Sequence, residues 1–194
     1  QYMSDSQHKL LPFLHLPLQS GSDSVLKKMK RRYNSKEYAD EIWKAYEAVP
    51  DICIGTDVMV GFPEEKQSEF ENTKYLLEKL PVSYLHVFPF SARKGTPAYY
   101  IEDQVLPSVK HQRSEELRNL SIQKRHEFNN RFLGDIRKVL WESPDSEGNI
   151  SGYTDNYIRV ILKEKGCYDF QNQILPTRLL SHHGKNVTGV NMVK

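Results

Sequence analysis

The sequence predicts an α/β fold that is followed by a small all-β barrel. Up to about residue 132, short apolar runs alternate with longer amphipathic patterns, which is typical of βα units around a parallel sheet. After Gly134 the pattern changes to short strands and turns, which is typical of a small barrel of the oligonucleotide-binding kind. With 194 residues, 38% of them hydrophobic, the chain can bury one good core, or one core and a small companion domain, and the change of pattern favours the second. We therefore expect two domains, residues 1–132 and residues 133–194.

The first domain is expected to hold three strands, each followed by a turn and a helical pattern. The strands are predicted at 13–18, 52–60 and 84–90, and the helices after 22, at 35–49, at 67–80 and at 108–132. Ser22 or Asp23 can cap the first helix. Phe70 and Leu77 lie on one apolar stripe of the third helix, which indicates the face that packs on the sheet.

The second domain is expected to consist of short strands. They are predicted at 136–141, 157–162, 174–180 and 187–193. In the clearest of them, residues 157–162, Ile158, Val160 and Leu162 lie on one face, which is predicted to line a core.

The composition of the chain argues against several classes of protein. The net charge is only +2, so attraction for a polyanion has to come from local clustering. No apolar run approaches the length of about 20 residues that spans a membrane, and nothing resembles a signal peptide. The two cysteines, Cys53 and Cys167, fit a reducing cytoplasm and are too far apart for a metal knuckle, so each is predicted to be a small buried hydrophobe. Because the chain begins with Gln1, it reads like a piece of a longer protein.

The three predicted strands end in "LQSGSD", "TDVMVGFPEE" and "FPFSARKGT". Ligands bind at the carboxyl ends of strands in parallel α/β sheets. Asp57 lies within a β-branched strand, where a carboxylate is costly unless it is hydrogen-bonded. A ligand site at these strand ends is one interpretation, and ordinary βα loops are the other.

A basic segment follows the first strand end. Five of the six residues from Lys27 to Arg32 are cations, with no acid between them. Contact with nucleic-acid phosphates is one interpretation of this helix, and a solvated cationic face is the other.

Four motifs in the expected order carry a family resemblance: the turn from Gln19 to Ser22, Met29-x-Arg31-x-Tyr33, the strand end from Asp57 to Pro63, and the loop Arg93-x-Gly95-Thr96-Pro97. "HLPLQSGSDSVLKKMKRRY", "GTDVMVGFPEEKQSEF", "LHVFPFSARKGTPA" and the linker-like helix "PSVKHQRSEELRNLSIQKRHEF" resemble the C-terminal part of the radical S-adenosylmethionine (SAM) methylthiotransferases. "GYTDNYIRV" resembles their RNA-binding TRAM module, so the resemblance covers nearly the whole chain. It implies that residues 1–132 are the C-terminal part of a radical SAM partial barrel with its linker helix, and that residues 133–194 are a TRAM domain.

The resemblance also implies a reaction. His86 and the extended "KKMKRRY" resemble the subgroup that adds a methylthio group to C2 of N6-threonylcarbamoyladenosine at position 37 of tRNA. The alternatives are action on isopentenyladenosine in tRNA, action on a ribosomal protein, and a non-catalytic RNA-binding protein that uses its barrel alone.

The implied cofactors are S-adenosylmethionine and, in the full-length enzyme, two [4Fe–4S] clusters. The family's cluster cysteines have no counterpart in this chain, so the chain alone is expected to be inactive, with no metal ligand and no catalytic acid or base. Glu64, Glu65, His182 and His183 are predicted to be surface groups. Glu64 stands where the family usually has Gly, which predicts strain if the backbone there is left-handed.

Two sets of site residues follow from the resemblance. The residues expected to bind S-adenosylmethionine are Gln19, Ser20, Gly21, Ser22, Asp57, Gly61 and Arg93. The residues expected to bind tRNA are Arg31, Arg32, Arg137, Tyr157 and Arg159, with an exposed tyrosine ring available for base stacking.

Overall fold

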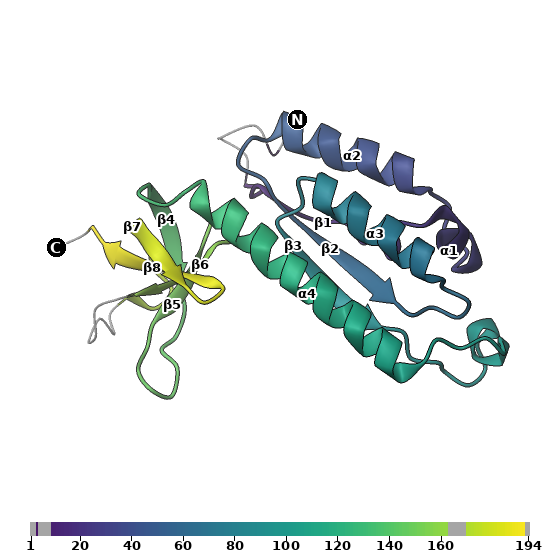
Figure 1. Cartoon of the computed structure of the whole chain (residues 1–194). Coiled ribbons are helices and arrows are strands. Elements are labelled where there is room, and N and C mark those ends of the chain that lie inside the picture. Colours follow the sequence, from purple (N-terminus) through teal and green to yellow (C-terminus); the bar gives the residue numbers. More distant parts are fainter. Residues whose placement is uncertain (1–2, 4–8, 163–169, 193–194) are drawn as a thin grey trace. The chain divides into compact units, whose positions relative to one another are not determined.

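A computed structural model describes residue 3, residues 9–162 and residues 170–192 (Figure 1). The chain divides into two compact units. We call residues 14–50 and 54–124 the α/β unit, and residues 1–13, 51–53 and 125–194 the barrel unit. Helix α4 (Pro107–Asn130) begins in the α/β unit and ends in the barrel unit.

The sheet of the α/β unit has three strands in the order β1-β2-β3. These are β1 (Phe13–His15), β2 (Cys53–Val60) and β3 (Tyr84–Pro89), and β2 and β3 run parallel with Asp57 opposite His86. The first strand is shorter than the predicted 13–18. After it the chain continues beside β2, since the Gln19 amide donates to the Asp57 carbonyl (2.9 Å) and the Gln19 carbonyl accepts from the Met59 amide (2.8 Å).

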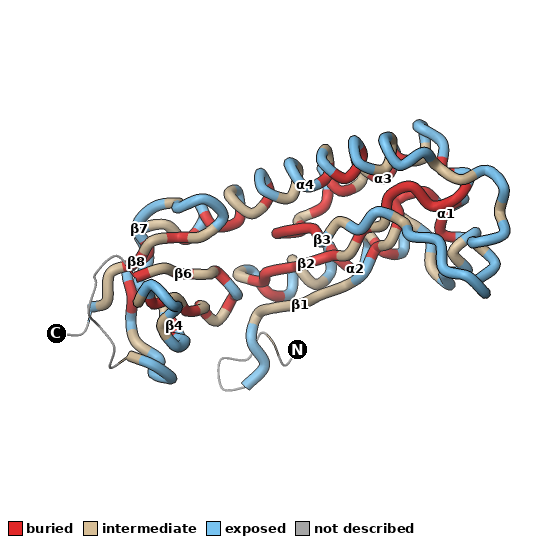
Figure 2. The backbone as a smooth tube through the Cα atoms, turned by 90° about the horizontal axis from the view of Figure 1, so that it is seen from below, coloured by how far each residue is buried: buried red, intermediate tan, exposed pale blue. Residues whose placement is uncertain are grey.

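Helices α1 (Asp23–Lys28), α2 (Ser35–Ala48) and α3 (Gln67–Lys79) accompany the strands in Figure 1, and a short 3-10 helix, η2 (Pro97–Tyr100), follows β3. A capping box between Asn34 and Glu37 starts α2. The helices bury Ile42, Phe70 and Leu77 completely, and in Figure 2 buried stretches are seen along β2 and α1.

The two faces of the sheet differ in character. Thr56 and Val58 on β2 are fully buried on the helix side, where the Tyr38 hydroxyl of α2 donates to Thr56 Oγ1 (2.8 Å). The opposite face carries the partly exposed side chains of His15, Asp57 and His86. Side chains alternate along a strand, so this face collects every second residue of each strand.

The barrel unit contains a closed barrel with the strand order β4-β5-β6-β8-β7. The strands are β4 (Ile136–Trp141), β5 (Ser151–Thr154), β6 (Arg159–Leu162), β7 (Ile174–His183) and β8 (Asn186–Asn191). Val139, Trp141 and Val160 are among the fully buried side chains of its core. The predicted small barrel is therefore confirmed.

Three predicted details differ from the structure. Strand β5 was not expected, since its four residues "SGYT" are short and polar. Tyr157 precedes β6 in a turn with φ 64° rather than beginning the strand. The basic segment is not one helix, because α1 ends at Lys28 and Lys30 has φ 57°.

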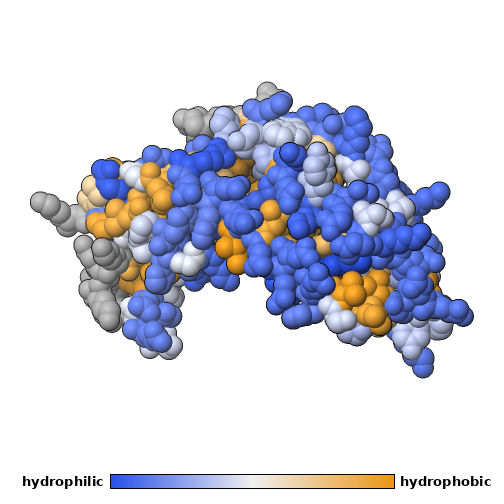
Figure 3. Space-filling model, viewed as in Figure 1, coloured by the Kyte–Doolittle hydropathy of each residue, from blue (hydrophilic) through white to orange (hydrophobic). Residues whose placement is uncertain are grey.

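The surface in Figure 3 is mainly hydrophilic and carries several apolar patches. Exposed apolar side chains on the outer face of β4 and β7 include Ile136, Leu140 and Ile174. Within the described residues, every helix is too short or too polar to cross a bilayer.

Candidate functional site

Three ionisable side chains from three neighbouring strands meet on the open face of the sheet. His15 Nε2 lies 2.9 Å from Asp57 Oδ1, and His86 Nδ1 lies 3.4 Å from the same oxygen. The side chain of Asp57 is 26% exposed, so this half-buried carboxylate has the polar partners that such a position requires. We call these three residues the His–Asp–His cluster.

Gly55 makes room for the cluster on the same face of β2. A Cβ atom at position 55 would lie 2.4 Å from the Tyr84 hydroxyl oxygen and 2.8 Å from His15 Nδ1, which is closer than side chains can approach. In the absence of that atom, His15 Nδ1 and the Tyr84 hydroxyl lie 3.4 Å apart. Tyr84 is 5% exposed, so the partner of His15 Nδ1 is a buried hydroxyl group.

The sequence singled out Asp57 as a site residue and His86 only as a family marker, and it missed His15 and Tyr84. One signal was present, since Tyr84 and His86 are two residues apart and therefore share a face. The pairing of His15 with Asp57 depends on strand order and register, which a single sequence does not give.

Gln19 lies at the end of β1 in a left-handed conformation, with φ 67°. A residue other than glycine held in this region is strained, and such strain is concentrated at functional sites. Its backbone amide and its backbone carbonyl both form hydrogen bonds with β2, as described above. The side chain is partly exposed, so Gln19 can contact a ligand at the strand ends.

The next three predicted residues, Ser20, Gly21 and Ser22, are buried. The Gly21 amide donates to Thr73 Oγ1 of α3 (2.9 Å), and a Cβ atom at Gly21 would lie 2.7 Å from the Thr73 Cα. The Ser22 amide donates to Ser20 Oγ (3.2 Å). These groups pack the turn against α3, so the structure brings them near the strand ends but not onto the ligand-accessible surface.

Gly61 directly follows β2 with φ 73°, and its amide donates to Glu65 Oε2 (2.6 Å). Arg113 Nη1 of α4 lies 2.7 Å from the same oxygen. Glu65 is 4% exposed, so its prediction as a surface group is wrong, because the tight turn after Gly61 folds it inward onto Arg113. Burial raises the pKa of the Glu65 carboxyl, although the Gly61 amide and the Arg113 guanidinium oppose that rise.

Glu64 is exposed, as predicted, and has φ 63°. The left-handed backbone that was the condition for strain at this position is therefore present. Its carboxylate lies 3.1 Å from Lys28 Nζ at the end of α1. The ion pair is partly exposed and contributes about 0–1 kcal/mol, which offsets part of the backbone strain.

The third strand end carries Arg93 in an exposed loop. The Thr96 hydroxyl donates to the Arg93 carbonyl (2.7 Å), and Gly95 with φ 88° completes the turn. Among the described residues the Arg93 guanidinium makes no ion pair, so it is available to a carboxylate or phosphate.

Arg31 and Arg32 follow α1 and are exposed. Within the part of the chain that the structure describes, neither forms an ion pair with an acid. Both guanidinium groups can therefore contact an anionic partner.

Tyr157 lies between two other rings of the barrel unit. Its centroid is 4.3 Å from that of Phe13 and 4.7 Å from that of Tyr153, and both pairs are stacked. Arg159 continues the row, with its guanidinium carbon 5.2 Å from the Tyr153 centroid and Nη1 donating to the Tyr153 hydroxyl (2.7 Å). Since both faces of Tyr157 are covered, it presents only its edge and hydroxyl to a base.

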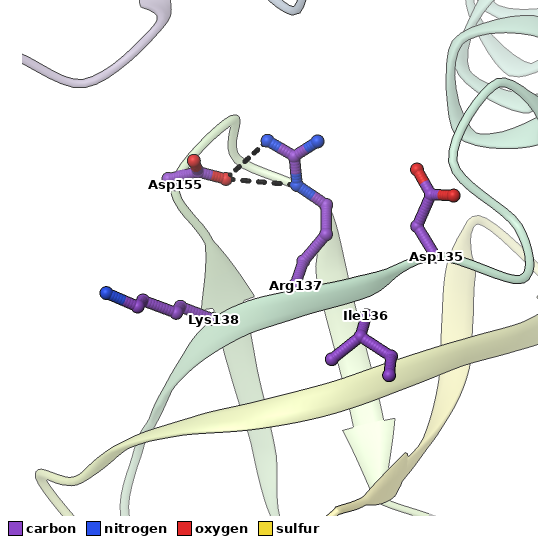
Figure 4. A pocket seen from close by; sticks show the side chains of 5 residues that line it. All are labelled: Asp135, Ile136, Arg137, Lys138 and Asp155. Atoms are coloured by element: carbon purple, nitrogen blue, oxygen red, sulfur yellow. Dashed lines mark hydrogen bonds and ion pairs between the residues drawn. The ribbon is translucent and has the colours of Figure 1, made fainter. Parts of the chain in front are cut away.

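Arg137 lines a pocket of about 400 Å³ in the barrel unit with Asp135, Ile136, Lys138 and Asp155 (Figure 4). Its guanidinium lies 2.9 Å from Asp155 Oδ1 and 2.9 Å from Asp51 Oδ2, and its side chain is 15% exposed. Arg137 is therefore neutralised by two acids. Lys138, which the sequence analysis did not place in the site, is the exposed cation of this pocket.

Cys53 is fully buried in β2, as predicted. Cys167 lies outside the described residues.

The chain thus combines an α/β unit, which carries the His–Asp–His cluster on its sheet, with a small closed barrel. No family model matches the sequence. The chain is 37% identical over 91% of its length to the threonylcarbamoyladenosine tRNA methylthiotransferase MtaB of Bacillus subtilis. It is 36% identical over 95% of its length to the tRNA-2-methylthio-N(6)-dimethylallyladenosine synthase of Ehrlichia canis, and 41% identical over 76% of its length to the enzyme of that name from Pseudomonas aeruginosa.

The chain is thus a homologue of the tRNA methylthiotransferases, and the family resemblance of its motifs is confirmed. It spans 40% of the length of the Bacillus subtilis enzyme, 42% of the Ehrlichia canis enzyme and 34% of the Pseudomonas aeruginosa enzyme. Relatives named for two different modified adenosines match at similar identity, so the comparisons do not select between those nucleosides.

Proposed function

We propose that this chain is the C-terminal part of a radical SAM methylthiotransferase that adds a methylthio group to C2 of N6-threonylcarbamoyladenosine at position 37 of tRNA. The 37% identity, over 91% of the chain, to a tRNA methylthiotransferase carries the proposed reaction class, and the resemblance of "LHVFPFS" and "KKMKRRY" to one subgroup favours this nucleoside. The presence of His86 on the open face of the sheet adds support, since this residue marks the same subgroup. With tRNA as its substrate, the enzyme acts in the cytoplasm.

The strand ends fit S-adenosylmethionine by their donor and acceptor chemistry. Asp57 and the strained Gln19 offer oxygen acceptors for its amino group and ribose hydroxyls, and the exposed Arg93 offers a guanidinium for its carboxylate. When bound, the cofactor supplies the radical that activates the adenine. The buried turn at Ser20–Ser22 positions Gln19 by packing against α3.

An iron–sulfur cluster does not fit this part of the chain. Such a cluster needs several converging thiolates, and among the described residues only Cys53 is a cysteine, fully buried in the sheet. We place the cluster ligands in the part of the relatives that this chain does not span, and derive no step through them.

The RNA contacts are proposed for Arg31, Arg32, Arg159 and the edge of Tyr157, and the structure adds the exposed Lys138. Arg137 is proposed to stabilise the barrel surface rather than to contact RNA phosphates directly, because Asp51 and Asp155 already balance its charge. A TRAM-type barrel suits this role, since small barrels of this kind bind single-stranded nucleic acid by charge and stacking.

The test is nucleoside analysis of tRNA from cells that lack their own methylthiotransferases and express the full-length protein containing this chain. Mass spectrometry should detect 2-methylthio-N6-threonylcarbamoyladenosine. A methylthio group on dimethylallyladenosine instead would support the second candidate, which rests on the 36% identity over 95% of the chain to the Ehrlichia canis enzyme. No methylthiolated adenosine, in the presence of folded protein, would contradict both.

A further inference from the structure

The cluster of His15, Asp57 and His86 has the composition and spacing of a metal-ligand set, and we infer that it binds a divalent transition-metal ion. One potential ligand atom from each residue lies within 4.8 Å of the others. Zinc binds imidazole nitrogen and carboxylate oxygen at about 2.0–2.2 Å, so neighbouring ligand atoms around one ion lie roughly 3–3.5 Å apart. The observed separations from Asp57 Oδ1, 2.9 Å to His15 Nε2 and 3.4 Å to His86 Nδ1, closely match that spacing.

The sheet holds the three ligands in place. His15, Asp57 and His86 come from three adjacent strands, and Asp57 and His86 are register partners in the parallel ladder. Ligands on strands keep their relative positions better than ligands on loops do. To coordinate an ion together with Asp57, only the two histidine rings have to move closer to each other.

A partner beyond the ligands completes the arrangement. A metal-bound histidine usually uses its second ring nitrogen in a hydrogen bond that fixes its tautomer and orientation. His15 directs Nε2 at Asp57, and its Nδ1 lies 3.4 Å from the buried Tyr84 hydroxyl. The missing side chain at Gly55 is what allows Tyr84 to reach this position.

Two imidazoles and one carboxylate select the class of ion. This set suits Zn²⁺, Fe²⁺, Co²⁺ and Ni²⁺ better than Mg²⁺ or Ca²⁺, which prefer all-oxygen sites. The side chains are 28%, 26% and 55% exposed in chain order, which leaves room for water or a substrate oxygen at the remaining positions. Both short contacts use Asp57 Oδ1, so Oδ2 stays available for the cofactor proposed above.

The inference does not depend on the proposed function, because its test uses metal alone. The tag-free chain, treated with a chelator and dialysed, is titrated with Co²⁺ and then with Zn²⁺. We expect about one equivalent of Co²⁺ with visible d–d absorption, displaced by Zn²⁺. His15→Ala and His86→Ala should each weaken binding by at least tenfold, and Tyr84→Phe by about tenfold.

His111→Ala is the matched control, because His111 is an exposed histidine on α4 whose partner is Glu115. It should bind Co²⁺ as the wild type does. Asp57→Asn keeps the shape of the carboxylate side chain and guards against loss of folding, which circular dichroism monitors in every variant. Folded wild-type chain that binds no Co²⁺, or that binds it no better than His15→Ala and Asp57→Asn, would overturn the inference.

Discussion

Gly61 shows how one residue sets the end of β2. With φ 73° it occupies a region that side chains with a Cβ atom avoid, and a Cβ atom there would lie 2.4 Å from Lys110 Cγ. We expect Gly61→Ala to lower the free energy of unfolding by about 1–2 kcal/mol from the backbone alone, with an added loss from displacing Lys110. Chemical denaturation measures this change.

Gly95→Ala separates the backbone cost from the cost of displacing a neighbouring side chain. Gly95 also has a positive φ, 88°, but open space where its Cβ would be. It should show only the backbone cost. An equal loss for both variants would mean that the contact with Lys110 contributes nothing.

A second prediction at the residue scale concerns pH. Desolvation and the neighbouring His126 lower the pKa of His182 below its ordinary value of 6.5. The unfolded chain then takes up the proton first, so stability should fall as the pH drops below about 6.5 toward the folded-state pKa. His182 was predicted as a surface group, but its ring is half-buried and bonded to Asn130 Oδ1 (2.7 Å).

Thermal unfolding at pH 7 and pH 5 tests this dependence. His182→Gln should reduce the difference between the two melting temperatures, whereas His183→Gln, at an exposed neighbour, should leave it unchanged. The same pH dependence in both variants would assign it to other groups.

At the scale of elements, helices and strands were predicted more reliably than contacts. Most boundaries agree within two residues, because apolar periodicity and turn residues are local signals. The site was predicted only in part. Asp57 is unusual within its own strand, whereas its partner His15 is 42 residues away in sequence and meets it only through strand pairing. The row of Phe13, Tyr157 and Tyr153 was missed for the same reason.

The segment after α1 gives a prediction about RNA. Arg31 and Arg32 are exposed and without acidic partners among the described residues, so each can replace a counterion on tRNA. The double variant Arg31→Ala/Arg32→Ala should weaken tRNA binding and reduce the slope of log K against log salt by about 0.7–0.9 per lost phosphate contact.

Lys36→Ala/Lys44→Ala is the matched control. It also removes two cations, but each is already paired on α2, with Asp40 and with Glu41. Affinity for labelled tRNA at several salt concentrations should change only in the arginine variant. Equal losses would indicate a dependence on total charge rather than a site.

At the scale of the whole molecule, the chain combines an α/β unit that presents a polar sheet face with a barrel unit that we propose as the RNA-binding part. If the barrel unit holds the tRNA, a chain that stops before Gly134 should bind it more weakly than the intact chain does. Fluorescence anisotropy with labelled tRNA measures both affinities. Equal affinity would assign RNA binding to the segment at Arg31 and Arg32.

The central claim is that this chain acts as the C-terminal part of a tRNA methylthiotransferase. It is tested most directly by a chimera in which this chain replaces the corresponding part of a relative. The chain replaces the aligned two-fifths of Bacillus subtilis MtaB in cells that lack that enzyme, and tRNA nucleosides are measured by mass spectrometry. We predict that 2-methylthio-N6-threonylcarbamoyladenosine returns, and that Asp57→Ala in the exchanged part abolishes it. A chimera that is expressed, folded and loaded with its clusters, yet leaves the threonylcarbamoyladenosine unmodified, would contradict the claim.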